Sequence, residues 1–142
     1  MQLYGFKYKR NHLVSQAFWI ISSVYFYKFD PMDDLLQDIR QTLMDNADKT
    51  TSDTMARFFK EGEGAKRYGV PIEIARKIGK EVFREIKKEP KQEIFSLCNE
   101  LWKSKIFEEA YIACIISKSI RKQYEAKDME IYENWVNLYV NN

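Results

Sequence analysis

The feature that most constrains the fold is an apolar pattern with helical spacing that runs from residue 33 to residue 140. Apolar side chains recur three and four residues apart, as they do on the buried face of an amphipathic helix. Five glycines and three prolines are few for a chain of 142 residues, so tight turns are scarce. The pattern predicts an all-α fold, with at least five helices and no sheet in residues 32–142.

Six helices are expected, and prolines mark the start of two of them. Pro71 and Pro90 suit the first turn of a helix, where a missing N–H costs nothing. Asp33 and Asp34 place negative charge at the start of the first helix, which the helix dipole favours. Thr51 or Ser52 is expected to cap the second. The expected helices cover residues 33–43, 51–59, 71–86, 90–102, 107–124 and 126–140.

Four of these segments have one apolar face, namely 33–43, 71–86, 90–102 and 126–140, and residues 107–124 are apolar over much of the circumference. That breadth predicts a central helix. At its start, Glu108 and Glu109 are accounted for by the helix dipole without a catalytic role. Trp102 shares a face with Leu97 and is predicted to be a packing residue. The residues expected to be buried are Leu35, Leu36, Ile39, Leu43, Ala75, Ile78, Val82, Phe83, Ile86, Ile94, Leu97, Cys98, Leu101, Trp102, Met129, Tyr132, Val136 and Tyr139.

Successive helices with short connections favour stacked antiparallel pairs. Such pairs, of about 40 residues each, build the α-solenoids of the HEAT and armadillo type. Exact repeats are not visible in the sequence, so a helical bundle is the alternative architecture. Residues 32–142 are interpreted as one helical-repeat domain.

Residues 1–31 differ in kind from the rest and are interpreted as an N-terminal extension. Lys7, Lys9 and Arg10 precede an apolar run at 13–29 that polar residues interrupt. The run is short for a transmembrane helix, which needs about 20 apolar residues, and no signal-peptide cleavage site is evident. A packed extension, or a translated stretch upstream of a usual start at Met32, is favoured over a membrane role.

Composition excludes several kinds of site. His12 is the single histidine, so neither a Ser-His-Asp arrangement nor a histidine-based metal site can form. Cys98 and Cys114 lack CxxC spacing and are expected to be reduced, buried thiols of a cytoplasmic protein. Gly62 and Gly64 have no third glycine at dinucleotide-binding spacing, so they indicate a loop. The net charge of +2 neither predicts nor excludes binding to nucleic acid.

Several short stretches, taken in order, resemble the DNA alkylation repair (AlkD-like) glycosylases. An aromatic pair in MARFFKEG at 55–62 is followed by YGVP at 68–71 and RKI at 76–78. LWKS at 101–104 and FEE at 107–109 are similar to a junction between repeats of that family. NWV at 134–136 with YVNN at 139–142 looks like its "W-x-x-x-Y-V-x-N" segment. The resemblance covers residues 32–142.

The resemblance implies hydrolysis of the N-glycosidic bond of N3- or N7-alkylated purines in duplex DNA, without a metal or cofactor. Phe58 falls where the family has an aromatic residue near the lesion, although a core position is the alternative. A basic rim for phosphates would be formed by Lys60, Lys66, Arg67, Arg76 and Lys77, if these residues are not simply solvated. The oligomeric state is not predicted.

The same resemblance leaves the catalytic residue unassigned. In the family, the segment ending at Asn142 continues into a "W-x-x-C-D" motif that supplies an aromatic residue and the catalytic aspartate. The aspartate is therefore expected beyond Asn142, and this chain alone is expected to be inactive. The alternative is a non-catalytic helical-repeat module that binds protein or nucleic acid through its concave surface.

Overall fold

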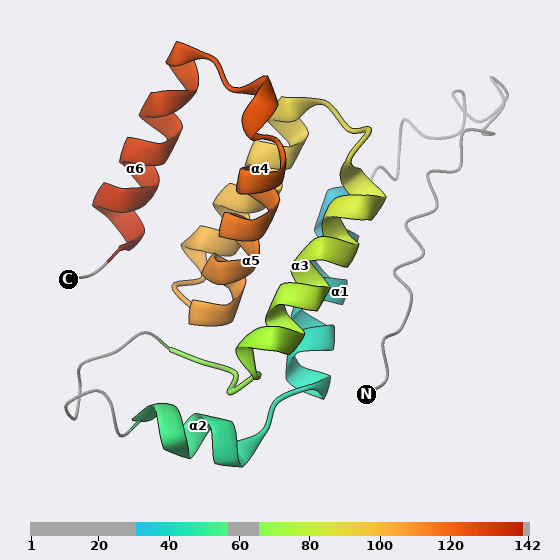
Figure 1. Ribbon diagram of the computed structural model, residues 1–142, viewed down its shortest axis with the longest axis vertical. Helices are drawn as coiled ribbons and strands as arrows, with labels where there is room; N and C mark the ends of the chain where they lie inside the picture. The colour runs from blue at the N-terminus through green and yellow to red at the C-terminus, as the bar shows by residue number, and fades with distance from the viewer. Residues whose placement is uncertain (1–30, 57–65, 141–142) are drawn as a thin grey trace, which may run out of the picture.

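The computed structural model describes residues 31–56 and 66–140, and these residues are helical with short connections (Figure 1). The all-α prediction is confirmed. Within the described residues there is no strand, only an isolated bridge between Lys66 and Ile106. The helices are α1 (Pro31–Asp45), α2 (Lys49–Ala56), α3 (Ile72–Ile86), α4 (Lys91–Lys103), α5 (Phe107–Ser119) and α6 (Met129–Tyr139), with two 3₁₀ turns, η2 (Arg121–Gln123) and η3 (Ala126–Asp128).

The start of α2 differs from the prediction. Asp48, rather than Thr51 or Ser52, caps the helix: its carboxylate accepts the backbone N–H of Thr50 at 3.3 Å and of Thr51 at 2.9 Å. The Thr51 hydroxyl also donates to it, at 2.8 Å. These hydrogen bonds, first the one from the Thr51 hydroxyl, lower the pKa of Asp48. Asp48 has the short acceptor side chain that suits a cap, so α2 begins at Lys49. The expected end at Phe59 lies outside the described residues.

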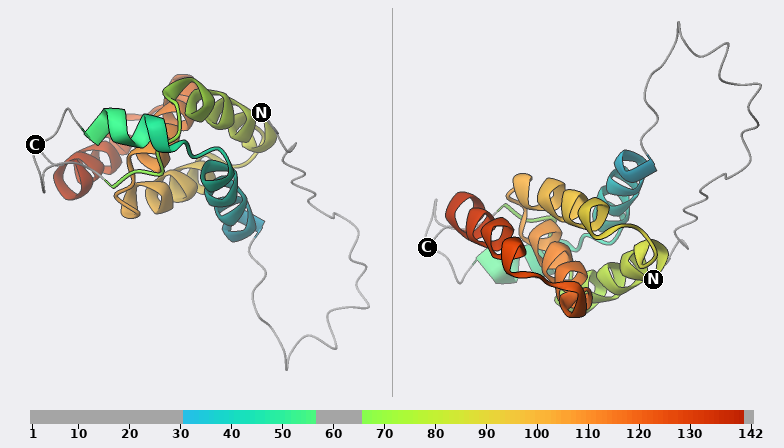
Figure 2. Two further views of the ribbon diagram at one scale, coloured as in Figure 1. Left: turned by 90° about the horizontal axis from the view of Figure 1, so that it is seen from below. Right: turned by 90° about the horizontal axis from the view of Figure 1, so that it is seen from above.

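The helices other than α2 pack in two layers, and α2 lies across their lower end in Figure 1. α4 lies between α1 and α6, while α3 lies beside α5 (Figure 2). α5 contacts both α3 and α4, as its apolar circumference predicts. Gly79 allows α3 to approach α5 closely, because a Cβ at that position would lie 3.1 Å from the Ile115 side chain. The arrangement is compatible with the stacked pairs of an α-solenoid.

The predicted faces of α1, α3 and α4 form the core. Leu35, Ile39, Ile78, Val82, Ile94 and Leu101 are among the side chains buried there. Phe83 and Trp102 are half-buried against this core, so the packing role of Trp102 is confirmed with partial burial. α5 ends at Ser119, earlier than expected, and the chain continues into η2.

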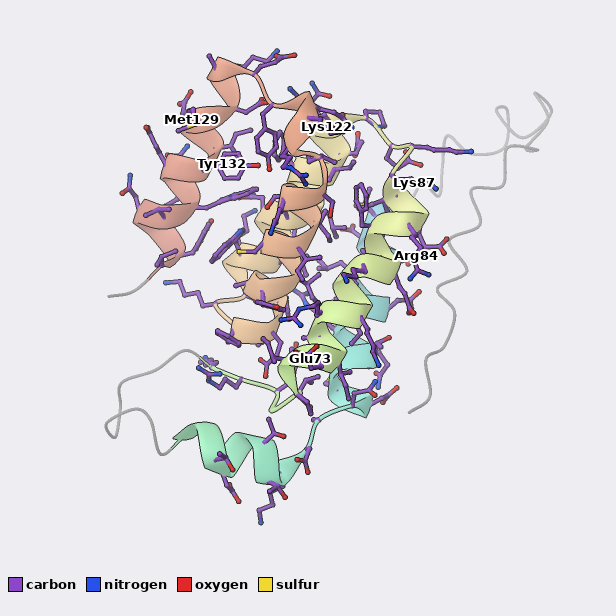
Figure 3. The ribbon with its side chains drawn as sticks, in the orientation of Figure 1. Glu73, Arg84, Lys87, Lys122, Met129 and Tyr132 are labelled. Atoms are coloured by element: carbon purple, nitrogen blue, oxygen red, sulfur yellow. The ribbon has the colours of Figure 1, made fainter. Side chains whose placement is uncertain are left out.

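The predicted inner face of α6 is partly wrong. Met129 and Val136 are 59% and 57% exposed, whereas Trp135 is 4% exposed. Tyr132 and Tyr139 are half-buried as expected, and Figure 3 shows Tyr132 directed from α6 toward the neighbouring helices.

Aromatic contacts explain the orientation of α6. The Trp135 ring lies 6.1 Å from that of Phe95, 6.2 Å from that of Trp102 and 5.1 Å from that of Tyr132. Its Nε1 donates to Asn99 at 3.3 Å. Burial of the large indole, with a partner for its N–H, outweighs burial of a valine or methionine side chain.

The two cysteines differ in burial. Cys98 is buried, as predicted, but Cys114 is exposed, because it lies on the outer side of α5; both are free thiols. Burial raises the pKa of the Cys98 thiol. None of the helices in residues 31–56 and 66–140 is long and apolar enough to cross a membrane.

The orientation of α6 gives a testable contrast between neighbouring residues. Trp135→Ala removes a buried ring and should lower the free energy of unfolding by about 3–5 kcal/mol. Val136→Ala changes an exposed side chain and should alter it by less than about 0.5 kcal/mol. Chemical denaturation followed by circular dichroism measures both. Equal effects would show that α6 presents a different face to the core.

Candidate nucleic-acid interface

The buried carboxylate of Glu108 binds the backbone of a distant loop. It accepts N–H hydrogen bonds from Tyr68 at 3.1 Å, Gly69 at 2.9 Å and Val70 at 3.1 Å. Gly69 has a φ of 84°, a left-handed conformation that glycine adopts without strain, and successive N–H groups in such a turn make an anion-binding concavity. Glu108 therefore holds residues 68–70 against the start of α5.

Glu109, the next residue, connects three parts of the fold. Its fully buried carboxylate accepts hydrogen bonds from the Arg40 guanidinium of α1, at 3.2 Å, and from the Tyr68 hydroxyl, at 2.7 Å. Burial, and then the hydrogen bond to Glu109, raises the pKa of Tyr68, so the phenol remains a donor. The negative charge is thus paired and hydrogen-bonded, as a buried charge must be.

The same loop carries two of the predicted DNA-binding residues. The backbone N–H of Phe107 donates to the carbonyl of Lys66 at 2.9 Å, next to the bridge between Lys66 and Ile106. Lys66 and Arg67 are therefore fixed beside the N-terminus of α5. This position follows from backbone contacts and does not depend on their charged side chains.

Two arginines and two aromatic rings form a continuous row, here named the arginine–aromatic ladder. The guanidinium carbon of Arg67 lies 4.2 Å from the centre of the Phe107 ring, a cation–π distance. The Phe107 and Tyr111 rings stack, with centres 6.2 Å apart and planes 14° apart. The Tyr111 hydroxyl then accepts a hydrogen bond from Nε of Arg76 at 3.2 Å. Arg76 also pairs with Glu73 at 2.7 Å.

The structure brings together some of the predicted residues and not others. Arg67 and Arg76 lie at the two ends of the ladder. Lys66 is exposed next to Arg67, and Lys77 is exposed on α3. Phe58 and Lys60 lie outside the described residues, so their roles stay predictions. Sequence reasoning missed the ladder rings and the loop contacts of Glu108. The signal that could have indicated these rings is the spacing of Phe107 and Tyr111, which lie four residues apart on a helix that is apolar over nearly its whole circumference.

The buried carboxylates in the described part of the chain are all engaged. Besides Glu108 and Glu109, Asp128 accepts hydrogen bonds from Lys91 at 2.9 Å and from the Glu125 backbone at 2.8 Å. These contacts, first the one with Lys91, lower its pKa. No group of three or more His, Cys, Asp or Glu residues suited to a metal occurs in 31–56 and 66–140. What the site offers is a cationic surface supported by aromatic rings, which suits phosphate binding.

The chain matches the model of a known protein family. A family model described as DNA alkylation repair enzyme matches residues 39–142. No significant match is found among the curated proteins or the solved structures. The matched residues contain the loop at 66–70, the ladder and both buried glutamates.

Glu108→Ala tests the anchoring of the loop. The substitution leaves three backbone donors without their acceptor, and each buried unsatisfied donor costs about 1–3 kcal/mol. We expect the free energy of unfolding to fall by at least about 3 kcal/mol, measured by urea denaturation. Glu85→Ala, at an exposed position of α3, is the control and should be nearly neutral. Similar values for the two variants would contradict the anchoring role.

Proposed function

This chain belongs to the DNA alkylation repair enzyme family, and on that premise we propose that it acts on duplex DNA in which purines carry alkyl groups at N3 or N7. The proposed reaction is hydrolysis of the N-glycosidic bond. The single observation that supports this best is the arginine–aromatic ladder, which lies inside the matched residues 39–142 and includes two residues of the predicted basic rim, Arg67 and Arg76.

The ladder suits phosphate binding because the aromatic residues orient the arginines. Arg76 uses Nε for Tyr111 and Nη1 for Glu73, and its side chain is 41% exposed. Its Nη2 makes no hydrogen bond within the described residues and remains available to a phosphate oxygen. Pre-oriented guanidinium groups lose less conformational entropy on binding than mobile ones. Lys66 and Lys77 are exposed and add positive charge next to Arg67 and Arg76 in the sequence.

The proposed chemistry needs little from the protein. An alkylated purine is positively charged and already a good leaving group, so catalysis consists of stabilising the developing positive charge on the sugar and positioning water. A carboxylate serves that purpose. Glu108, Glu109 and Asp128 are bound to other protein groups. We therefore propose that the catalytic carboxylate is a different residue, and the family resemblance points to the aspartate of the "W-x-x-C-D" motif.

A second candidate function is a non-catalytic helical-repeat module that binds nucleic acid or protein. The engagement of Glu108, Glu109 and Asp128, the buried carboxylates among the described residues, favours it, because none of the three is available for catalysis. The two candidates share a binding surface and differ in whether a carboxylate reaches the sugar.

The first test is binding. Arg67→Gln with Arg76→Gln removes both guanidinium groups of the ladder, and each lost phosphate contact should make the slope of log affinity against log salt shallower by about 0.9. We therefore expect weaker binding and a slope shallower by about two, measured by fluorescence anisotropy with a labelled duplex. Lys103→Gln with Lys127→Gln is the matched control, since both lysines pair with exposed carboxylates. An equal slope for both double variants would contradict the ladder's role.

The second test is activity. If the aspartate of the "W-x-x-C-D" motif is the catalytic group, the 142-residue chain should release 7-methylguanine from methylated duplex DNA no faster than spontaneous depurination, because residues 1–142 do not contain that motif. A homologue that extends past Asn142 into the "W-x-x-C-D" motif should release the base, and Asp→Asn in that motif should abolish release. Release by the 142-residue chain above the spontaneous rate would show that a carboxylate within it is catalytic. Failure of the extended homologue would favour the non-catalytic module.

A further inference from the structure

Helix α2 differs from the other helices in how it is held. Four of its described side chains are exposed: Lys49, Thr50, Asp53 and Thr54. Among the described side chains, the hydrophobic core contains none between Leu43 of α1 and Val70 of the loop. No other helix packs along α2 in the described part of the chain, and Figure 1 shows it across one end of the layers. Apolar packing supplies most of the stability of protein helices, so α2 depends on something else.

One hydrogen bond joins α2 to the anchored loop. The backbone N–H of Asp48 donates to the carbonyl of Gly69 at 2.9 Å, and the N–H of Gly69 donates to Glu108 at 2.9 Å. Between residues 48–56 and 66–140, the described residues make no other hydrogen bond or ion pair. A single hydrogen bond stabilises far less than the burial of an apolar helix face. The bond from Asp48 to Gly69 is therefore the weakest attachment of a helix in this part of the fold.

The chain on either side of this bond is closed into separate helices. At the end of α1, the backbone N–H of Asn46 donates to the Thr42 carbonyl at 3.2 Å, and its side-chain amide donates to the same oxygen at 2.8 Å. The N–H of Ala47 donates to the Met44 carbonyl at 3.2 Å. Asp48 then caps α2 with its carboxylate. The chain between Ala47 and Asp48 is thus the place where α2 can separate from α1.

The length and composition of α2 determine what happens to it after separation. It has eight residues, and isolated helices shorter than about 12–15 residues are marginal in water. Threonine, which occurs three times in it, also has a low helix propensity. Once α2 leaves the loop it should therefore unfold, and all its amides should become exposed together.

We propose that α2 is a releasable helix: when the hydrogen bond between Asp48 and Gly69 breaks, residues 49–56 detach and unfold as one unit. The loop at 66–70 stays in place, because Glu108 binds its N–H groups. The rest of the described fold also stays, since its core contains no described side chain of α2. A ligand on the arginine–aromatic ladder then meets a fixed loop and, next to it, a helix that can leave. The inference does not depend on which ligand binds there.

Amide hydrogen exchange of the full chain, resolved by NMR spectroscopy, measures the release of α2. Asp53 and Thr54 report on α2, and Ile112 reports on the core. Asp48→Pro removes the N–H that donates to Gly69 and also the cap, whereas Asp48→Ala removes the cap alone. Lys49→Pro is the matched proline control. It places the ring at the first helical position, where a missing N–H costs nothing, and keeps the bond to Gly69.

In the unmodified chain, Asp53 and Thr54 should share one opening constant. Both should exchange at least about 100-fold faster than Ile112, yet more slowly than an unstructured peptide. Asp48→Pro should accelerate both amides about tenfold more than Asp48→Ala does, because only the proline removes the hydrogen bond. Lys49→Pro should not accelerate them, and Ile112 should be unaffected in all three variants.

Three results would overturn the inference. Exchange of Asp53 and Thr54 as slow as that of Ile112 would show that α2 opens only when the whole fold opens. Exchange at the rate of an unstructured peptide would show that α2 is not formed in solution. Equal acceleration by Asp48→Pro and Asp48→Ala would show that the bond to Gly69 does not hold the helix.

Discussion

The candidate nucleic-acid interface depends on one interaction: the buried carboxylate of Glu108 accepts hydrogen bonds from three successive backbone N–H groups, those of Tyr68, Gly69 and Val70. The loop at 66–70 has no regular structure of its own, and its buried N–H groups need acceptors. Glu108 supplies them from the first turn of α5, where the helix dipole also stabilises its charge. This anchorage leads the chain into α3 just after Pro71. Together with the hydrogen bond from the Phe107 N–H to the Lys66 carbonyl, it also holds Arg67 over the Phe107 ring.

Acidic and basic side chains have separate roles in this layer of the fold. The acids at the start of α5 are buried and neutralised by N–H groups, by Arg40 and by the Tyr68 hydroxyl. The cations of α3 are exposed, and those beyond Arg76 have no ion-pair partner in the described part of the chain. The net charge of +2 is thus unevenly distributed: Glu108 and Glu109 are inside, whereas the lysines and arginines of α3 lie at the surface beside Glu73, Glu81 and Glu85. This separation is what makes a phosphate-binding surface physically reasonable in a nearly neutral protein.

Local patterns predicted much of the fold, and long-range contacts account for most of what they missed. The buried faces of α1, α3 and α4 follow from helical spacing, which is a local property. From the sequence alone, only the helix dipole accounts for Glu108, because the backbone N–H groups that it binds lie 38–40 residues away and no local pattern reveals them. The prediction that Met129 and Val136 lie on the buried face of α6 is wrong. Trp135 is buried instead, because it packs on Phe95 and Trp102 of α4, and periodicity within α6 does not reveal that contact. The candidate arginines were predicted through resemblance, but the rings that hold them became evident only once α3 and α5 were seen side by side.

Amide hydrogen exchange of the unmodified chain tests the central claim, that Glu108 holds the loop at 66–70 in a fixed position. If it does, the amides of Tyr68, Gly69 and Val70 exchange only when the fold opens, as slowly as the helical amide of Ile112 in the core of α5. NMR spectroscopy resolves these amides individually. Exchange of all three at the rate of an unprotected loop, while Ile112 remains protected, would contradict the account.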